Sequence, residues 1–173
     1  RQRMAATAGD NARMRRIYLL LTAALLAACS PTFNWRSVAV TGTPLTATLP
    51  CKPDHAVREV DWGAGQVPLT MLGCKAGGAT FTVSHLHVAS PTDAPVVLER
   101  WQQALQKQLQ LAPGTPAGEA FLIKNGLELP QARHASWQGR NAQGDAVYAD
   151  VRWFVRLEGS GARVYQAMVL SPG

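Results

Sequence analysis

The 173-residue sequence lacks most of the motifs by which an enzyme activity is recognised. It has no Gly-x-Ser-x-Gly elbow and no glycine-rich phosphate loop before a helix. Its three cysteines include no Cys-x-x-Cys pair, which argues against a redox-active dithiol. No internal repeat and no low-complexity tract occurs. The sequence motifs therefore do not identify a biochemical activity.

An uncharged run near the N-terminus is too short to cross a membrane as a helix. Ile17–Ala28 is a dozen residues long, whereas a membrane helix needs about 20. Arg15 and Arg16 precede the run. The run lacks the polar face that a helix packed on a protein core usually turns toward solvent. A basic pair followed by a short apolar run is typical of an export signal.

The residues that close this run, Leu26-Ala27-Ala28-Cys29, resemble the lipobox of bacterial lipoproteins. The resemblance implies that a lipid is attached to the thiol of Cys29, with palmitate among the acyl chains, and that the mature protein begins there. Ser30 follows the cysteine, and in many Gram-negative lipoproteins a residue other than Asp at this place favours the outer membrane. The implied location is the outer membrane, with the domain facing the periplasm.

We expect four segments along the chain. Residues 1–13 precede a start at Met14 and are expected to be upstream sequence outside the native protein. Residues 14–28 are the signal peptide, and residues 29–44 are a lipid-anchored tether that leads into a first strand. Residues 45–173 are long enough for one domain and too short for two.

The net charge of +6 comes mostly from the export segment. Residues 1–28 hold five Arg and one Asp, so 12 basic and 10 acidic residues remain in 29–173, a net charge of +2. The basic balance therefore reflects targeting, and we expect no nucleic acid among the partners.

Alternating apolar residues predict an antiparallel sheet of about six to seven strands. The clearest alternation begins at Val147, with Val151 and Trp153 on one face and Tyr148 and Phe154 on the other. The other expected strands lie at 45–49, 57–62, 67–71, 79–88, 133–139 and 162–170, and a short element is expected at 121–123.

A single helix pattern begins at Pro95, after a capping segment at Ser90. Its apolar stripe consists of Val97, Trp101, Ala104, Leu105 and Leu109, and its polar face of Gln102, Gln103, Gln106, Lys107 and Gln110. We therefore expect an α+β fold in which Trp101 is buried on the sheet. Because one helix covers one face, the opposite face, with Tyr148, Phe154 and Tyr165, is expected to be partly exposed unless a missing C-terminal segment or a partner covers it.

A second resemblance covers roughly Leu45 to Leu170. The segments Leu49–Pro53, Gly78–Val83 and Val164–Leu170 are similar to those of uncharacterised bacterial envelope proteins with a PsbP-like α/β/α sandwich. Members usually add a C-terminal helix, whereas this sequence stops at Gly173, so either the helix is absent or the sequence is cut short. The resemblance implies a fold and no activity.

Cys51 and Cys74 are predicted to form a disulfide. If a lipid occupies Cys29, these two remain as an even pair in a compartment that oxidises thiols. Both are expected close to strand ends at one edge of the sheet.

The histidines give a weak indication of a metal. His85 and His87 lie two apart on one strand face, but no third ligand is evident. His55 and His134 are distant in sequence, with Asp54 and Asp150 as the available carboxylates. We therefore expect neither a metal nor another cofactor.

A row of charged and aromatic residues is the place where a ligand or partner is expected, although such rows are more often sheet faces with cross-strand ion pairs. It consists of Tyr148, Asp150, Arg152, Phe154, Arg163 and Tyr165.

Two functional classes follow. The favoured one is a non-enzymatic lipoprotein that serves as a binding or envelope-assembly module for another envelope protein or a small ligand. The alternative is a small hydrolase or metal-dependent enzyme that uses His85, His87 or His134, which would require a deep pocket holding two of them and a carboxylate.

Overall fold

The computed structural model describes residues 32–62 and 65–173, and Phe33–Gly173 form a compact unit with its own core. The unit therefore begins before residue 45, where the sequence placed the start of the domain. The expected upstream segment, signal peptide and lipidated Cys29 lie outside the described residues. Within the described part, no helix is long and apolar enough to span a membrane.

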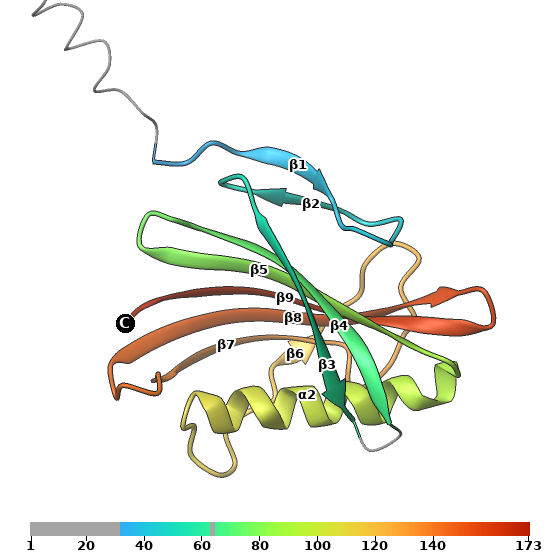
Figure 1. The fold of residues 1–173 in the computed structure, drawn as a ribbon. Coiled ribbons are helices and arrows are strands. Elements are labelled where there is room, and N and C mark those ends of the chain that lie inside the picture. The colour runs from blue at the N-terminus through green and yellow to red at the C-terminus, as the bar shows by residue number, and fades with distance from the viewer. Residues whose placement is uncertain (1–31, 63–64) are drawn as a thin grey trace, which may run out of the picture. The chain divides into compact units, whose positions relative to one another are not determined.

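A seven-stranded antiparallel sheet forms the centre of the unit (Figure 1). Its strand order is β3-β4-β5-β9-β8-β7-β6, so the pairing of β5 with β9 joins the two halves. The strands are β3 (Asp54–Asp61), β4 (Gln66–Ala76), β5 (Ala79–Val88), β6 (Glu119–Ala120), β7 (Arg133–Arg140), β8 (Ala146–Glu158) and β9 (Gly161–Pro172). This arrangement, with one α-helix packed on the sheet, confirms the expected α+β fold.

One face of the sheet packs against α2 (Ala94–Gln108), which follows the short 3₁₀-helix η1 (Pro91–Asp93). The hydroxyl of Ser90 caps η1 by accepting the backbone N–H of Thr92 at 3.3 Å. Trp101 is buried in one cluster with Val151 and Trp153, as the helix stripe and the β8 alternation predict.

Two residues of α2 were assigned to the wrong face. Ala104, expected in the apolar stripe, is exposed. Gln102, expected in solvent, is buried, and its amide donates to the carbonyl of Gln131 at 2.7 Å. The segment before β7 lies over this side of the helix and supplies an acceptor, so a polar side chain is buried there with its hydrogen bond satisfied.

A two-stranded hairpin covers the other face of the sheet (Figure 1). It consists of β1 (Arg36–Ala39) and β2 (Thr46–Leu49), so part of the expected tether is a strand. Val40 and Leu49 form a second core cluster with Leu72 of β4 and Val83 of β5.

The expectation that this second face is partly exposed holds for Tyr148, which is 38% exposed, and was wrong for Phe154 and Tyr165. Phe154 and Tyr165 are 6% and 0% exposed, and their rings stack at 4.9 Å. Phe121 packs on Phe154 at 6.1 Å, and the turn of the hairpin brings Thr43 to the Tyr165 hydroxyl. Two segments without a helical pattern therefore supply the cover that a second helix would give.

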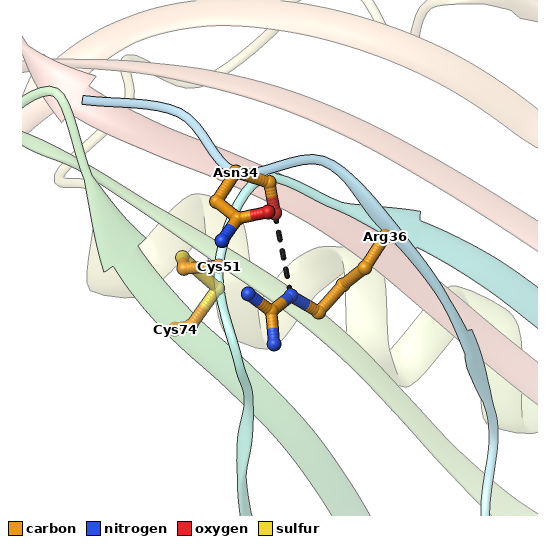
Figure 2. The surroundings of a disulfide bond; sticks show 4 residues. All are labelled: Asn34, Arg36, Cys51 and Cys74. Carbon is orange, nitrogen blue, oxygen red and sulfur yellow. Dashed lines mark hydrogen bonds between the residues drawn. A yellow bond between two sulfur atoms is a disulfide. The ribbon is translucent and has the colours of Figure 1, made fainter. Parts of the chain in front are cut away.

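A disulfide between Cys51 and Cys74 ties this hairpin to the sheet, which confirms the predicted pair. The Cα atoms are 5.9 Å apart, and the bond joins the chain just after β2 to β4. Figure 2 shows Arg36 and Asn34 beside it, with the Arg36 Nε donating to the Asn34 carbonyl at 3.3 Å.

The burial on both faces predicts similar costs for two aromatic truncations. Trp101→Ala and Phe154→Ala should each lower the free energy of unfolding by about 3 to 5 kcal/mol, because each removes a buried ring. Tyr148→Ala is the matched control, since Tyr148 lies on the same face of β8 as Phe154 and is 38% exposed. Denaturant melts that give equal losses for Phe154→Ala and Tyr148→Ala would contradict the cover over Phe154.

Candidate functional site

The polar residues on the hairpin side of the sheet form two groups separated by the Phe154–Tyr165 stack. The first, which we call the His134 cluster, consists of Glu119, His134, Ser136, Asp150 and Arg152. The second, which we call the His85 cluster, consists of Thr41, His85, Glu158, Arg163 and Tyr165.

Asp150 is the centre of the His134 cluster. The antiparallel register places Ser136 opposite Asp150 and His134 opposite Arg152, so four side chains of β7 and β8 meet on one face. His134 Nε2 lies 2.7 Å from Asp150 Oδ2, and the Ser136 hydroxyl donates to the same oxygen at 2.9 Å. Arg152 Nη1 donates to the other oxygen, Oδ1, at 2.6 Å.

These contacts favour the charged form of Asp150. Partial burial alone would raise the pKa of its carboxyl group, but the hydrogen bonds from His134 and Ser136 and the charge of Arg152 outweigh it. The net effect is a pKa below the ordinary value, so Asp150 is a carboxylate at neutral pH.

Glu119 approaches the cluster from the edge of the sheet. Its carboxylate lies 3.3 Å from His134 Nδ1 and is 80% exposed, so the pair contributes little to stability. Gly118 has a φ of +93° and lies so close to the carbonyl of His134 that a Cβ atom would collide with it. This glycine allows β6 to begin at Glu119, whereas the sequence placed the short element at 121–123.

Arg152 also contacts an aromatic ring. Its guanidinium lies 5.9 Å from the centroid of Phe121, which packs in turn on Phe154 and His134. The Arg152 side chain is 40% exposed, so it is held by a carboxylate and a ring while it still faces solvent.

The His85 cluster is buried under the hairpin turn. His85 is 2% exposed, and its Nε2 lies 3.0 Å from the carbonyl of Thr41, to which it donates. Arg163 Nη1 donates to His85 Nδ1 at 3.0 Å, and Arg163 Nε donates to Glu158 at 2.6 Å. Burial and the neighbouring Arg163 charge lower the pKa of His85, which fits a neutral ring protonated at Nε2.

These contacts leave no ring nitrogen of His85 for a metal. His87 lies on the same face of β5, as expected, but it is exposed, and Nδ1 of His55 is 3.4 Å from the Thr41 hydroxyl. Among the described residues, no three His, Cys, Asp or Glu side chains are grouped so that they could hold a metal ion.

The contacts in the His134 cluster also differ from those of a nucleophile activated by a histidine. In such a site the serine hydroxyl hydrogen-bonds to the imidazole, and a carboxylate orients the imidazole. Here Ser136 and His134 bind the same oxygen of Asp150. The arrangement holds a carboxylate in place and does not activate Ser136.

An open cleft of about 540 Å³ adjoins the His134 cluster. It is lined by Thr115, Pro116 and Gly118 of the loop before β6 and by Glu119, His134 and Ser136. The Trp137 indole N–H donates to the carbonyl of Pro116 at 2.9 Å and so holds this loop in place.

The row of six residues singled out in the sequence is therefore divided. Phe154 and Tyr165 are buried, and Arg163 is engaged by Glu158 and His85. Tyr148, Asp150 and Arg152 remain at the solvent-facing end. Glu119 and Ser136, which complete the cluster, were missed because only the strand register brings Glu119 to His134 and Ser136 to Asp150. The local signal in the sequence was Gly118, which precedes β6.

Comparisons with protein-family models, with curated proteins and with solved structures find no match to this chain.

The depressed pKa of Asp150 predicts a pH-dependent contribution to stability. Asp150→Asn should lower the free energy of unfolding by about 1 to 3 kcal/mol at pH 7, because it removes a charged acceptor of three donors. The folded-state pKa is below the unfolded value, so this stabilisation is present above about pH 4 and is lost as pH falls through the folded pKa.

The difference between the wild type and Asp150→Asn in denaturant melts should therefore shrink in acid. Glu128→Gln, at an exposed position, is the matched carboxylate control and should change stability by less than about 0.5 kcal/mol. A difference for Asp150→Asn that stays constant from pH 7 to pH 3 would contradict the assignment.

Proposed function

We propose that the protein is a non-enzymatic, lipid-anchored envelope protein whose domain binds a partner protein on the periplasmic side of the outer membrane. The lipobox-like segment that ends at Cys29 supports the anchor. The Cys51–Cys74 disulfide supports the periplasmic location, because disulfides persist in oxidising compartments such as the periplasm.

The observation that carries the binding role is the half-exposed His134 cluster. Asp150 and Arg152 hold each other in place on the sheet, and the guanidinium of Arg152 also lies over the Phe121 ring. A side chain that is already ordered loses little conformational entropy when a partner binds. Arginine and tyrosine are also enriched among the residues that dominate binding energy at protein interfaces.

The shape of the surface favours a protein over a small ligand. The cleft beside the cluster is open, with Glu119 at its rim, and Tyr148 is exposed on the neighbouring part of the same face. Small-molecule sites usually enclose most of the ligand surface. The combination of carboxylates, a guanidinium and an exposed aromatic ring fits a polar, hydrogen-bonded protein interface.

The anchor predicts lipidation of one cysteine. In a Gram-negative host supplied with labelled palmitate, the wild-type chain should be labelled and Cys29→Ala should not, because the thioether needs the thiol. The matched control is the double variant Cys51→Ala, Cys74→Ala, which keeps Cys29 and should still be labelled. Equal labelling of the wild type and Cys29→Ala would end the lipoprotein proposal.

The binding surface predicts a site-specific crosslink. A photoreactive phenylalanine analogue placed at Tyr148 should give a discrete crosslinked species in intact cells, and one at the exposed Gln103 of α2 should not. Adding Arg152→Glu should abolish the species, while Arg100→Glu, a charge reversal at an exposed position on the helix, should leave it. A species that is unaffected by Arg152→Glu would overturn this assignment of the surface.

A further inference from the structure

Two exposed aromatic side chains lie at the beginning of the compact unit. Phe33 and Trp35 are 44% and 59% exposed, and their rings stack at 6.2 Å. Trp35 also meets Phe81 edge-on at 6.2 Å, and Phe33 packs so closely on the β4–β5 turn that a Cβ atom on Gly77 would collide with its ring. The fold therefore holds both rings in place while their outer surfaces face solvent.

The chain segments around these rings carry three basic residues, and the acidic residue next to them is Asp54, which pairs with Gly73 of β4. Residues 33–53 and 73–84 contain Arg36, Lys52 and Lys75, whereas all ten acidic residues of 29–173 lie elsewhere in the sequence. Arg36 lies beside the disulfide in Figure 2. Each lysine directly follows one of the two bonded cysteines, and both line one open cleft of about 540 Å³ in which Asp54 is the only carboxylate.

The proposed anchor limits where these residues can be. Four residues of chain span at most about 14 Å, so a lipid on Cys29 keeps Phe33 within that distance by chain length alone. The headgroup region of a bilayer is about 5 to 8 Å deep on each side. Phe33 and Trp35 are therefore within reach of the membrane interface, where tryptophan is enriched because its ring is apolar and its N–H is polar.

We propose that the Phe33–Trp35 pair, with the adjacent Arg36 and with Lys52 and Lys75 next to the disulfide, is a docking surface for an anionic lipid bilayer. The inference rests on the proposed lipid anchor and adds a second, electrostatic and interfacial attachment to it. The aromatic rings enter the headgroup region, and the three basic side chains face the lipid phosphates. The attachment orients the domain so that its N-terminal end faces the membrane.

The test uses residues 30–173, which contain the whole compact unit and no lipidation site. The probes are vesicles of phosphatidylcholine with 30% phosphatidylglycerol, and vesicles of phosphatidylcholine alone. The protein should sediment with the anionic vesicles and much less with the neutral ones, and binding should fall as salt is raised. Brominated lipid should quench Trp35, the exposed tryptophan, and this quenching should be absent in Trp35→Phe.

Matched variants distinguish binding through this surface from nonspecific adsorption of the protein to vesicles. Phe33→Ser with Trp35→Ser should abolish sedimentation, while Val57→Ser with Leu157→Ser, which replaces two exposed apolar residues elsewhere, should not. Lys52→Gln with Lys75→Gln should weaken binding about 25-fold, since each basic residue near the surface contributes about fivefold. Lys107→Gln with Lys124→Gln, at two exposed positions, should leave binding unchanged.

Three results would overturn the proposal: no binding to the anionic vesicles, equal losses in the test and control variants, or no quenching of wild-type Trp35 by brominated lipid. The quenching needs no variant that could fail to fold. Crosslinking of Trp35 to a protein without quenching would assign the surface to a protein partner and reject the bilayer. Palmitate labelling of Cys29 is measured separately, so a failed anchor and a failed docking surface give different results.

Discussion

The sheet has two apolar faces, and the rest of the fold follows from the need to cover both. The pairing of β5 with β9 builds one continuous surface, on whose helix side Leu86, Val164 and Val155 are buried. The other side carries Val83, Tyr165 and Phe154, which are also buried. A single α-helix can shield only one of these sides. The β1–β2 hairpin and the segment around Phe121 must therefore shield the other.

This cover also buries the polar ring of His85, and both of its nitrogens are hydrogen-bonded. The hairpin turn places the Thr41 carbonyl on His85, whose second nitrogen accepts from Arg163. Because both nitrogens are engaged, His85 contributes to the packing of the hairpin on the sheet. The polar residues with exposed surface lie beyond the edge of the cover, around Asp150, which is where binding is proposed.

The sequence predicted those parts of the fold that a regular pattern encodes. The period of two on β8 and the helical stripe around Trp101 are long enough to show which sides of the strand and the helix pack against each other. The alternation at 45–49 also predicted β2, whereas the four residues of β1 lie inside the expected tether. Gln102 is buried because Gln131, far away in sequence, offers an acceptor. The His134 cluster arises from strand register, which no single stretch of sequence reports.

If the chain is held at a membrane through Cys29, a force on the anchor would act first on the β1–β2 hairpin, the first structured element described after it. A pull on the N-terminus would peel β1 from β2, and the hairpin is held to the sheet mainly by the cluster of Val40, Leu49, Leu72 and Val83. The disulfide joins positions 23 residues apart and lies directly after β2, so peeling would stop at Cys51. Cross-links that close loops of this size contribute about 3 kcal/mol in the chain-entropy model. The bond thus protects β3 and the rest of the sheet from an unravelling that would begin at β1.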